Sequence, residues 1–170
     1  MPIVSKYLIP LKSDGNLNAT YSFVLNDNFF ESLEDAEIKT GDVKAYLKVK
    51  KLGEAFCIDV LMDGSVEVPC VRCLDPMTVE IEVDEHLKVS YGEAYLEEDD
   101  DRVVIPEDSE GIDMEWLMYE FIVLSIPIQH KHKEGDCNKQ MESLLSNYEN
   151  KLDEQTDPRW DALKSLIKNN

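Results

Sequence analysis

The strongest constraint on this chain is a strict alternation of apolar and polar positions between residues 43 and 62. The apolar set is Val43, Ala45, Leu47, Val49, Phe56, Ile58, Val60 and Met62, and a turn at Gly53 separates its two halves. Lysines and Tyr46 fill the intervening positions of the first half. Because side chains of a strand point alternately to opposite faces, this period predicts antiparallel strands with one buried and one wet face.

The alternation continues on both sides of this region. Asp63-Gly64 is a typical hairpin signal, and it predicts a turn into a strand that carries Val66, Val68 and Cys70 inward. A longer strand is expected over residues 77–89. Residues 3–11 and 18–26 read as two further strands, and a short helix is expected around Phe29 and Leu33.

Helical spacing dominates the last third of the chain. Asp113 is a candidate cap for a largely buried, mostly apolar helix over residues 114–124, which ends before Pro127. A second helix is expected over residues 141–152, and Asp157-Pro158 opens a third. Trp116 and Trp160 are expected in the core.

Strands first and helices second indicate an α+β fold: an antiparallel β meander packed by a buried helix and C-terminal helices. With 170 residues, the chain can bury about 70% of its unfolded surface, so a single domain over residues 1–170 is expected. Its predicted parts are a mainly β region (1–92), an acidic loop (93–112) and a helical part with a cysteine/histidine loop (113–170).

The negative charge is concentrated in one segment. The formal net charge is −19, and residues 93–115 hold eleven acidic residues against Arg102 alone. Such a segment repels RNA phosphates, so a basic protein is the better electrostatic match. The residues expected to face that partner are Glu97, Glu98, Asp99, Asp100 and Asp101.

No charged leader precedes an apolar region at the amino terminus, and Met114–Ile128 is too short and too charged to span a bilayer. We therefore expect a soluble cytoplasmic protein with no membrane contact. In that reducing compartment, closely spaced cysteines bind metal or perform redox chemistry more often than they form structural disulfides.

Cys70 and Cys73 are three residues apart, between two predicted strands. A thioredoxin-like pair needs a helix N-terminus behind it, and none is predicted here, which disfavours redox chemistry. The loop after Pro127 offers His132 and Cys137, which would complete a tetrahedral zinc site with Cys70 and Cys73. Leu74 stands where a zinc knuckle usually has glycine. A structural zinc and a set of packed, unliganded thiols therefore both stay open, and Cys57 is expected to be a packed residue.

Three segments, taken in order, resemble the YceD family, the bacterial large ribosomal RNA subunit accumulation proteins. They are CVRCLDPMTVEIE, IDMEWLMYEFIVLSIPIQHKHKEGDC and DPRWDALKSL, and the resemblance covers about residues 45–170. The positions that match the family motif are Cys70, Cys73, Pro127, His132, Cys137, Pro158, Leu163 and Leu166. His130 matches no position of the motif.

The resemblance implies a non-enzymatic factor for the synthesis, processing or stability of 23S rRNA, and it strengthens the case for a metal site. The implied partners are a large-subunit ribosomal protein, a 23S rRNA precursor, or both, with no small-molecule substrate. Cations expected to face RNA are Arg72, Lys131, Lys133, Lys139, Arg159, Lys164 and Lys168. Two alternatives are a thiol oxidoreductase that uses Cys70 and Cys73, and an acidic, zinc-stabilised interaction module unrelated to ribosomes.

Overall fold

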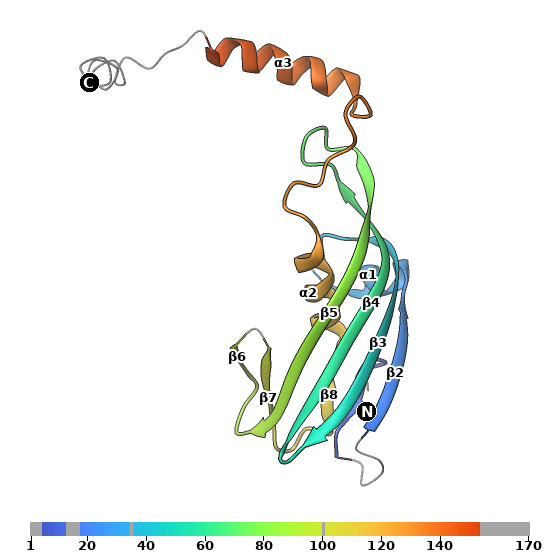
Figure 1. The fold of residues 1–170 in the computed structure, drawn as a ribbon, viewed down its shortest axis with the longest axis vertical. Helices are drawn as coiled ribbons and strands as arrows, with labels where there is room; N and C mark the ends of the chain where they lie inside the picture. Colours follow the sequence, from blue (N-terminus) through green and yellow to red (C-terminus); the bar gives the residue numbers. More distant parts are fainter. Residues whose placement is uncertain (1–4, 13–17, 35, 100, 154–170) are drawn as a thin grey trace, which may run out of the picture. The chain divides into compact units, whose positions relative to one another are not determined.

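The computed structural model describes residues 5–12, 18–34, 36–99 and 101–153. The chain divides into two compact units (Figure 1). Unit 1 comprises Met1–Val68 and Pro76–His130, and unit 2 comprises Pro69–Asp75 and Lys131–Asn170. The prediction for the last helix, with Arg159, Trp160, Lys164 and Lys168, lies outside the described residues.

A six-stranded sheet forms the body of unit 1, in the order β2-β3-β4-β5-β7-β6. Its strands are β2 (Asn18–Leu25), β3 (Thr40–Leu52), β4 (Ala55–Pro69), β5 (Pro76–Gly92), β6 (Leu96–Asp99) and β7 (Arg102–Pro106). The short strands β1 (Leu8–Pro10) and β8 (Gly111–Asp113) pair with each other. The predicted α+β fold and its mostly antiparallel sheet are confirmed, although β5 and β7 run parallel.

The apolar positions that alternate along β3 and β4 lie on the buried face of the sheet, as the sequence predicts. Val43, Leu47, Ile58 and Val60 are fully buried, and Val49 lies directly opposite Ile58 across the hairpin that turns at Gly53. Helices α1 (Asp27–Ser32) and α2 (Glu115–Ser125) add their buried side chains to the same core. The predicted short helix near Phe29 is thus confirmed.

The hairpin predicted at Asp63-Gly64 is wrong, because β4 runs through it without a turn. Gly64 lies opposite Val43 in the β3 ladder, and a Cβ at Gly64 would stand 2.6 Å from the Cα of Val43. This glycine is needed because the β3 backbone passes too close for any side chain, which is a recognised use of glycine inside a strand.

The loop expected over residues 93–112 is also wrong in large part, since β6, β7 and the start of β8 lie within it. Val103, Ile105 and Ile112 are each 2% exposed or less, and they bury the inner side of this segment in the core. Burial of three large apolar side chains outweighs the repulsion among exposed carboxylates, which are screened by water and salt.

The apolar helix is less buried than the sequence suggests. Leu117, Met118, Tyr119 and Ile122 of α2 are buried, but Trp116 is 46% exposed, contrary to the expected core position. Asp113 does help to begin the helix, because its carboxylate accepts a hydrogen bond from the Glu115 N–H at 3.0 Å. Among the described residues, no helix combines the length and apolar character needed to cross a membrane.

Candidate metal centre

The turn between β4 and β5 is closed by two backbone hydrogen bonds. The N–H of Cys70 donates to the carbonyl of Asp75, and the N–H of Leu74 donates to the carbonyl of Cys70, each at 2.9 Å. Leu74 adopts a left-handed conformation with φ of 65°. Leu74 occupies the position at which a zinc knuckle usually has glycine. The turn therefore forms with a leucine in the left-handed conformation, which costs about 1–2 kcal/mol.

The second segment of the site lies before α3 (Lys139–Asp153), which confirms the helix predicted over residues 141–152. Gly135 has φ of 91°, a conformation that glycine adopts without strain. The side chain of Asn138 caps α3 by accepting hydrogen bonds from the N–H groups of Gln140 and Met141. Its amide nitrogen donates to Asp75 at 3.1 Å, so it links this segment to the turn.

Four ligand-type side chains converge in unit 2. One ligand atom from each of Cys70, Cys73, His132 and Cys137 lies within 4.8 Å of all the others. The distance between Cys73 Sγ and His132 Nδ1 is 3.3 Å, against about 3.5 Å for two ligands of one tetrahedral zinc. All four predicted ligands are therefore brought together. Two thiolates on one tetrahedral zinc lie about 3.8 Å apart, so the widest separation in the cluster would need to shorten by about 1 Å to bind the metal.

The donor set also has the right chemistry. Structural zinc sites hold four thiolate or imidazole ligands, arranged without an open position for water. All four cysteines of the chain are free thiols, and Cys70, Cys73 and Cys137 are buried. Cys57 lies elsewhere, on β4 in unit 1, and is half-buried, so its role as a packed residue stays a prediction.

Hydrogen bonds tune the sulfur of Cys70. Burial opposes its ionisation, but backbone N–H groups of Cys73, Arg72 and His132 direct hydrogen bonds at the sulfur and lower its pKa to about 6. The distance from the Arg72 nitrogen to the sulfur is 3.4 Å. By contrast, burial and the neighbouring sulfurs raise the pKa of Cys137 to about 11.

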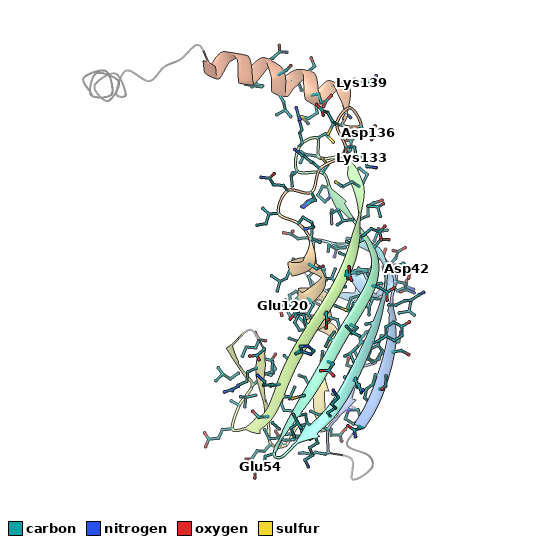
Figure 2. All side chains as sticks on the ribbon, in the orientation of Figure 1. Asp42, Glu54, Glu120, Lys133, Asp136 and Lys139 are labelled. Carbon is teal, nitrogen blue, oxygen red and sulfur yellow. The ribbon has the colours of Figure 1, made fainter. Side chains whose placement is uncertain are left out.

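Exposed cations adjoin the ligands of this centre in the sequence of unit 2. Arg72 lies between Cys70 and Cys73 in the turn, and Lys131 and Lys133 flank His132; all three cations are exposed. Lys133 and Lys139 belong to the segment that also carries Asp136 (Figure 2). Unit 2 thus carries the described members of the predicted RNA-facing set.

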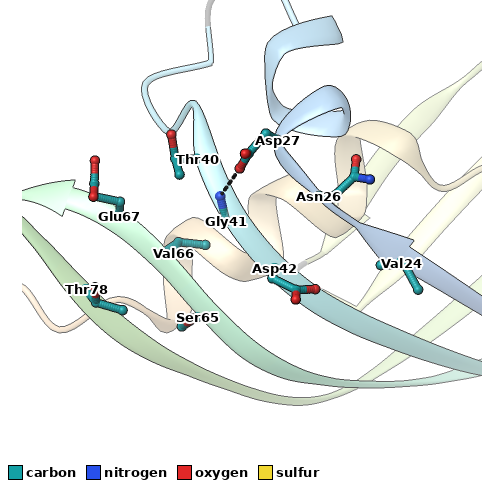
Figure 3. A pocket seen from close by; sticks show the side chains of 10 residues that line it. All are labelled: Val24, Asn26, Asp27, Thr40, Gly41, Asp42, Ser65, Val66, Glu67 and Thr78. Carbon is teal, nitrogen blue, oxygen red and sulfur yellow. Dashed lines mark hydrogen bonds between the residues drawn. The ribbon is translucent and has the colours of Figure 1, made fainter.

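A polar hollow of about 530 Å³ lies on unit 1, lined in part by Asp27, Asp42 and Glu67 (Figure 3). Asp27 accepts a hydrogen bond from the Gly41 N–H at 2.9 Å. All three carboxylates are exposed to water. Thr40, Ser65 and Thr78 also line the hollow, but among the described residues no hydrogen bond joins one of these hydroxyls to one of its carboxylates.

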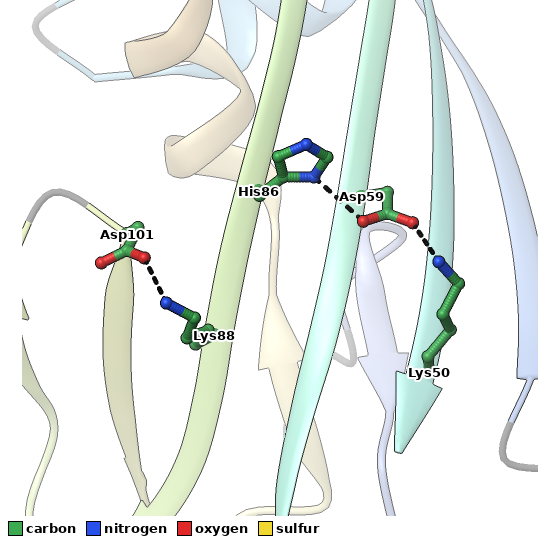
Figure 4. A network of polar contacts seen from close by, with 5 residues as sticks. All are labelled: Lys50, Asp59, His86, Lys88 and Asp101. Carbon is green, nitrogen blue, oxygen red and sulfur yellow. Dashed lines mark hydrogen bonds and ion pairs between the residues drawn. The ribbon is translucent and has the colours of Figure 1, made fainter. Parts of the chain in front are cut away.

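The predicted acidic contact residues have different environments. Asp101 forms an ion pair with Lys88 at 2.7 Å, and this lysine lowers the pKa of Asp101 (Figure 4). A second group joins Asp59 to Lys50 and His86 on the outer face of the sheet. Glu97 accepts a hydrogen bond from the Tyr95 hydroxyl. Glu98 and Asp99 belong to β6, and Asp100 lies outside the described residues.

The fold and the site together define an α+β protein with a cluster of three buried cysteines and one half-buried histidine, a set of zinc-site composition. The YceD family model, described as large ribosomal RNA subunit accumulation protein YceD, matches residues 58–167, and the chain belongs to this family. The match includes every residue of the cluster. The family description supports a ribosome-related role. A search of curated proteins returned no significant match, and neither did a search of solved structures.

Proposed function

We propose that this protein is a non-enzymatic factor that acts by binding during 23S rRNA synthesis, processing or stabilisation and large-subunit assembly. A structural zinc at Cys70, Cys73, His132 and Cys137 organises its unit 2. The observation that carries the proposal is the convergence of these four ligands, from segments about sixty residues apart, in a chain of the YceD family.

Burial supports the structural role of the metal. The buried side chains in the described part of unit 2 are the three cysteines of the cluster, whereas the hydrophobic core cluster belongs to unit 1. Small units that lack an apolar core are commonly held together by a metal, whose binding free energy then becomes folding free energy. Four protein ligands leave no open position for an activated water, so no hydrolytic chemistry is expected.

The cations near the cluster support a contact with rRNA. Arg72, Lys131 and Lys133 are exposed, and a metal would fix the two segments that present them. Phosphate contacts of this kind position a protein on RNA without reading the base sequence. With few cations in a chain of net charge −19, we expect a shallow dependence of RNA affinity on salt concentration.

The acidic segment supports a basic protein as a further partner. Glu97 and Glu98 lie on β6, an edge strand of the sheet. A basic ribosomal protein would neutralise these carboxylates and would be steered toward them over long range. Because β6 pairs with β7, neutralising substitutions at Glu97 and Glu98 test this contact better than a deletion would.

A genetic experiment tests the proposed function. In a strain that lacks this gene, the wild-type gene should restore mature 23S rRNA and the 50S peak in a sucrose gradient. Cys137→Ser should fail to restore either, and Cys57→Ser should restore both. Full restoration by Cys137→Ser would contradict a functional role for the cluster.

An RNA-binding experiment tests the contact surface. A filter-binding titration with a transcript of the 23S rRNA precursor should give a salt slope that corresponds to fewer than about six phosphate contacts. Charge reversal at Lys131 and Lys133 should weaken binding more than reversal at Lys44 and Lys48, which are exposed on β3. Equal effects of the two pairs would remove unit 2 from the proposed interface.

A thiol oxidoreductase is the second candidate, and the low pKa of Cys70 favours it. The burial of Cys70 and Cys73, at 0% and 2% exposure, works against it because a redox cysteine must meet its substrate disulfide. Reduction of insulin disulfides by the purified protein, lost in Cys70→Ser, would support this candidate against the binding factor.

A further inference from the structure

Helix α2 has an apolar surface that the described chain does not cover. Eight of its eleven residues are apolar or aromatic, so apolar side chains occur all around the helix. Helices of this composition are normally surrounded by protein or lipid. In α2 the side chains of Leu117, Met118 and Ile122 are buried, and the opposite side faces solvent.

The exposed stripe follows helical spacing. Trp116, Glu120 and Leu124 are four residues apart, and Val123 lies next to them on the same side. The exposed fractions are 46% for Trp116, 40% for Val123 and 78% for Leu124. We call Trp116, Glu120, Val123 and Leu124 together the α2 outer face. Clustered large apolar side chains of this kind mark interaction sites, whereas single exposed ones are ordinary.

Carboxylates give the α2 outer face a defined charge. Burial and the nearby Glu97 charge raise the pKa of Glu120. Tyr95, which donates its hydroxyl to Glu97, is affected by both carboxylates, so the start of β6 and the middle of α2 share one electrostatic environment. Glu120 forms no ion pair with any residue that the structure describes. A cation from outside the described chain would relieve the repulsion between Glu97 and Glu120.

We propose that the α2 outer face binds a basic amphipathic helix of a protein partner. Apolar side chains of that helix pack on Trp116 and Leu124, and a lysine or arginine beside them pairs with Glu120 and Glu97. Helices in this mode are recognised through anchors at spacings of three, four and seven residues, which match the spacing of the exposed side chains. This inference rests on the proposed function in one respect only, that the protein acts by binding.

Defined peptides test the proposal on the full-length protein. The probes are a fluorescently labelled 17-residue leucine–lysine peptide with one apolar face, a scrambled isomer of equal composition, and a leucine–glutamate analogue. At about 0.15 M salt, where long-range attraction is screened, the amphipathic leucine–lysine peptide should bind at least about tenfold more tightly than its scrambled isomer. Equal binding of the two isomers would overturn the proposal.

Leu124→Glu separates apolar contact from charge attraction. It adds a negative charge, so attraction alone would tighten binding of the basic peptide, whereas loss of the apolar contact should weaken it about tenfold. Leu52→Glu is the matched control, because Leu52 is an exposed leucine of the same unit, at 63% exposure on β3. The proposal fails if both variants change affinity equally.

A charge swap gives a second, independent variant. Glu120→Lys should weaken the leucine–lysine peptide and strengthen the leucine–glutamate peptide, and both changes should exceed those of Glu80→Lys on β5. Sedimentation equilibrium should find a monomer; a dimer that Leu124→Glu dissociates would assign the face to a second copy and overturn the proposal. Failure here would leave the genetic test of Cys137 unaffected, so the two proposals can fail separately.

Discussion

Unit 1 and unit 2 differ in what is buried inside them. Unit 1 contains the hydrophobic core cluster, with side chains from both of its sheets and from α1 and α2. In the described part of unit 2, the buried side chains are Cys70, Cys73 and Cys137. We infer that the apolar core stabilises the first unit and that metal coordination stabilises the second, so the two should respond to different perturbations.

The largest expected effect is on unit 2. Cys73→Ser removes one of the four proposed zinc ligands, and structural zinc contributes on the order of 10 kcal/mol in small metal-folded units. Protection from hydrogen exchange should therefore be lost at the amides of Cys70 and Leu74, which close the turn, while β3 and β4 stay protected. Cys57→Ser is the control and should leave the turn protected. If hydrogen exchange at the Leu74 amide were unchanged in Cys73→Ser, the proposed difference in how the two units are stabilised would be contradicted.

The second prediction concerns a substitution in the apolar core of unit 1, which should leave the metal site of unit 2 unaffected. Phe30 is fully buried and packs edge-to-face on Phe29 at 5.2 Å between ring centroids. Phe30→Ala should lower the free energy of unfolding of unit 1 by about 3–5 kcal/mol, measured by urea denaturation. Metal content should not change. A loss of metal together with the loss of stability would mean that the two units unfold together.

A smaller effect is expected at the close approach of β3 and β4. Gly64→Ala should destabilise unit 1 by about 2–3 kcal/mol, because the new methyl group would meet the Val43 backbone, which cannot move aside cheaply. A Cβ added at Gly53, in the hairpin, would have no atom within 4 Å. Gly53→Ala should therefore lower the stability of unit 1 by only about 1 kcal/mol, because of the φ of 67° alone. Thermal denaturation compares the two, and a larger loss at Gly53 would refute the packing argument.

The smallest effect has the opposite sign. Leu74 is 65% exposed and strained at φ of 65°, so Leu74→Gly should stabilise the turn by about 0.5 kcal/mol after the extra chain entropy of glycine is subtracted. The matched change Val71→Gly, at an exposed position of the same turn, should destabilise it. Competition with a metal-binding dye would detect both changes as shifts in apparent affinity. A weaker site in Leu74→Gly would show that this leucine makes a necessary contact.

Much of the sheet could be predicted because one periodicity governs β3, β4 and β5. The hairpin signal at Asp63-Gly64 is misleading, because a two-residue turn motif does not determine which residues of the flanking strands would lie opposite one another on the same face. A turn at 63–64 would place Met62 opposite Ser65 and Val60 opposite Glu67. Directly opposed residues share a face of the sheet, so this pairing would mix buried and exposed side chains. The unbroken apolar pattern through Val66 and Val68 therefore already favoured a continuous strand.

The error over residues 93–112 had a different cause. The many carboxylates of this segment obscure its short apolar alternation, which consists of Val103 and Ile105 alone. These two residues lie in β7, which pairs in parallel with β5, so that Val103 lies opposite Val89, fourteen residues earlier in the sequence. Pairings of this kind leave almost no local signal. The exposure of Trp116 was likewise unpredictable, because a helix that is apolar all around does not indicate which side meets the sheet.

The four ligands could be predicted from residue type and spacing, but their convergence could not. Whether the turn and the loop after Pro127 meet depends on contacts between segments about sixty residues apart, such as that of Asn138 with Asp75. The pKa of Cys70 likewise depends on the directions of nearby backbone N–H groups, which the spacing of residues in the sequence does not predict.

Elemental analysis tests the central claim most directly. The full-length protein, purified without a chelator or an affinity tag, should contain about one zinc per chain. That zinc should be absent from Cys137→Ser and retained in Cys57→Ser. Metal-free wild-type protein in which the amides of Cys70 and Leu74 are nevertheless protected from exchange would contradict the account, because packed thiols alone would then hold unit 2 together.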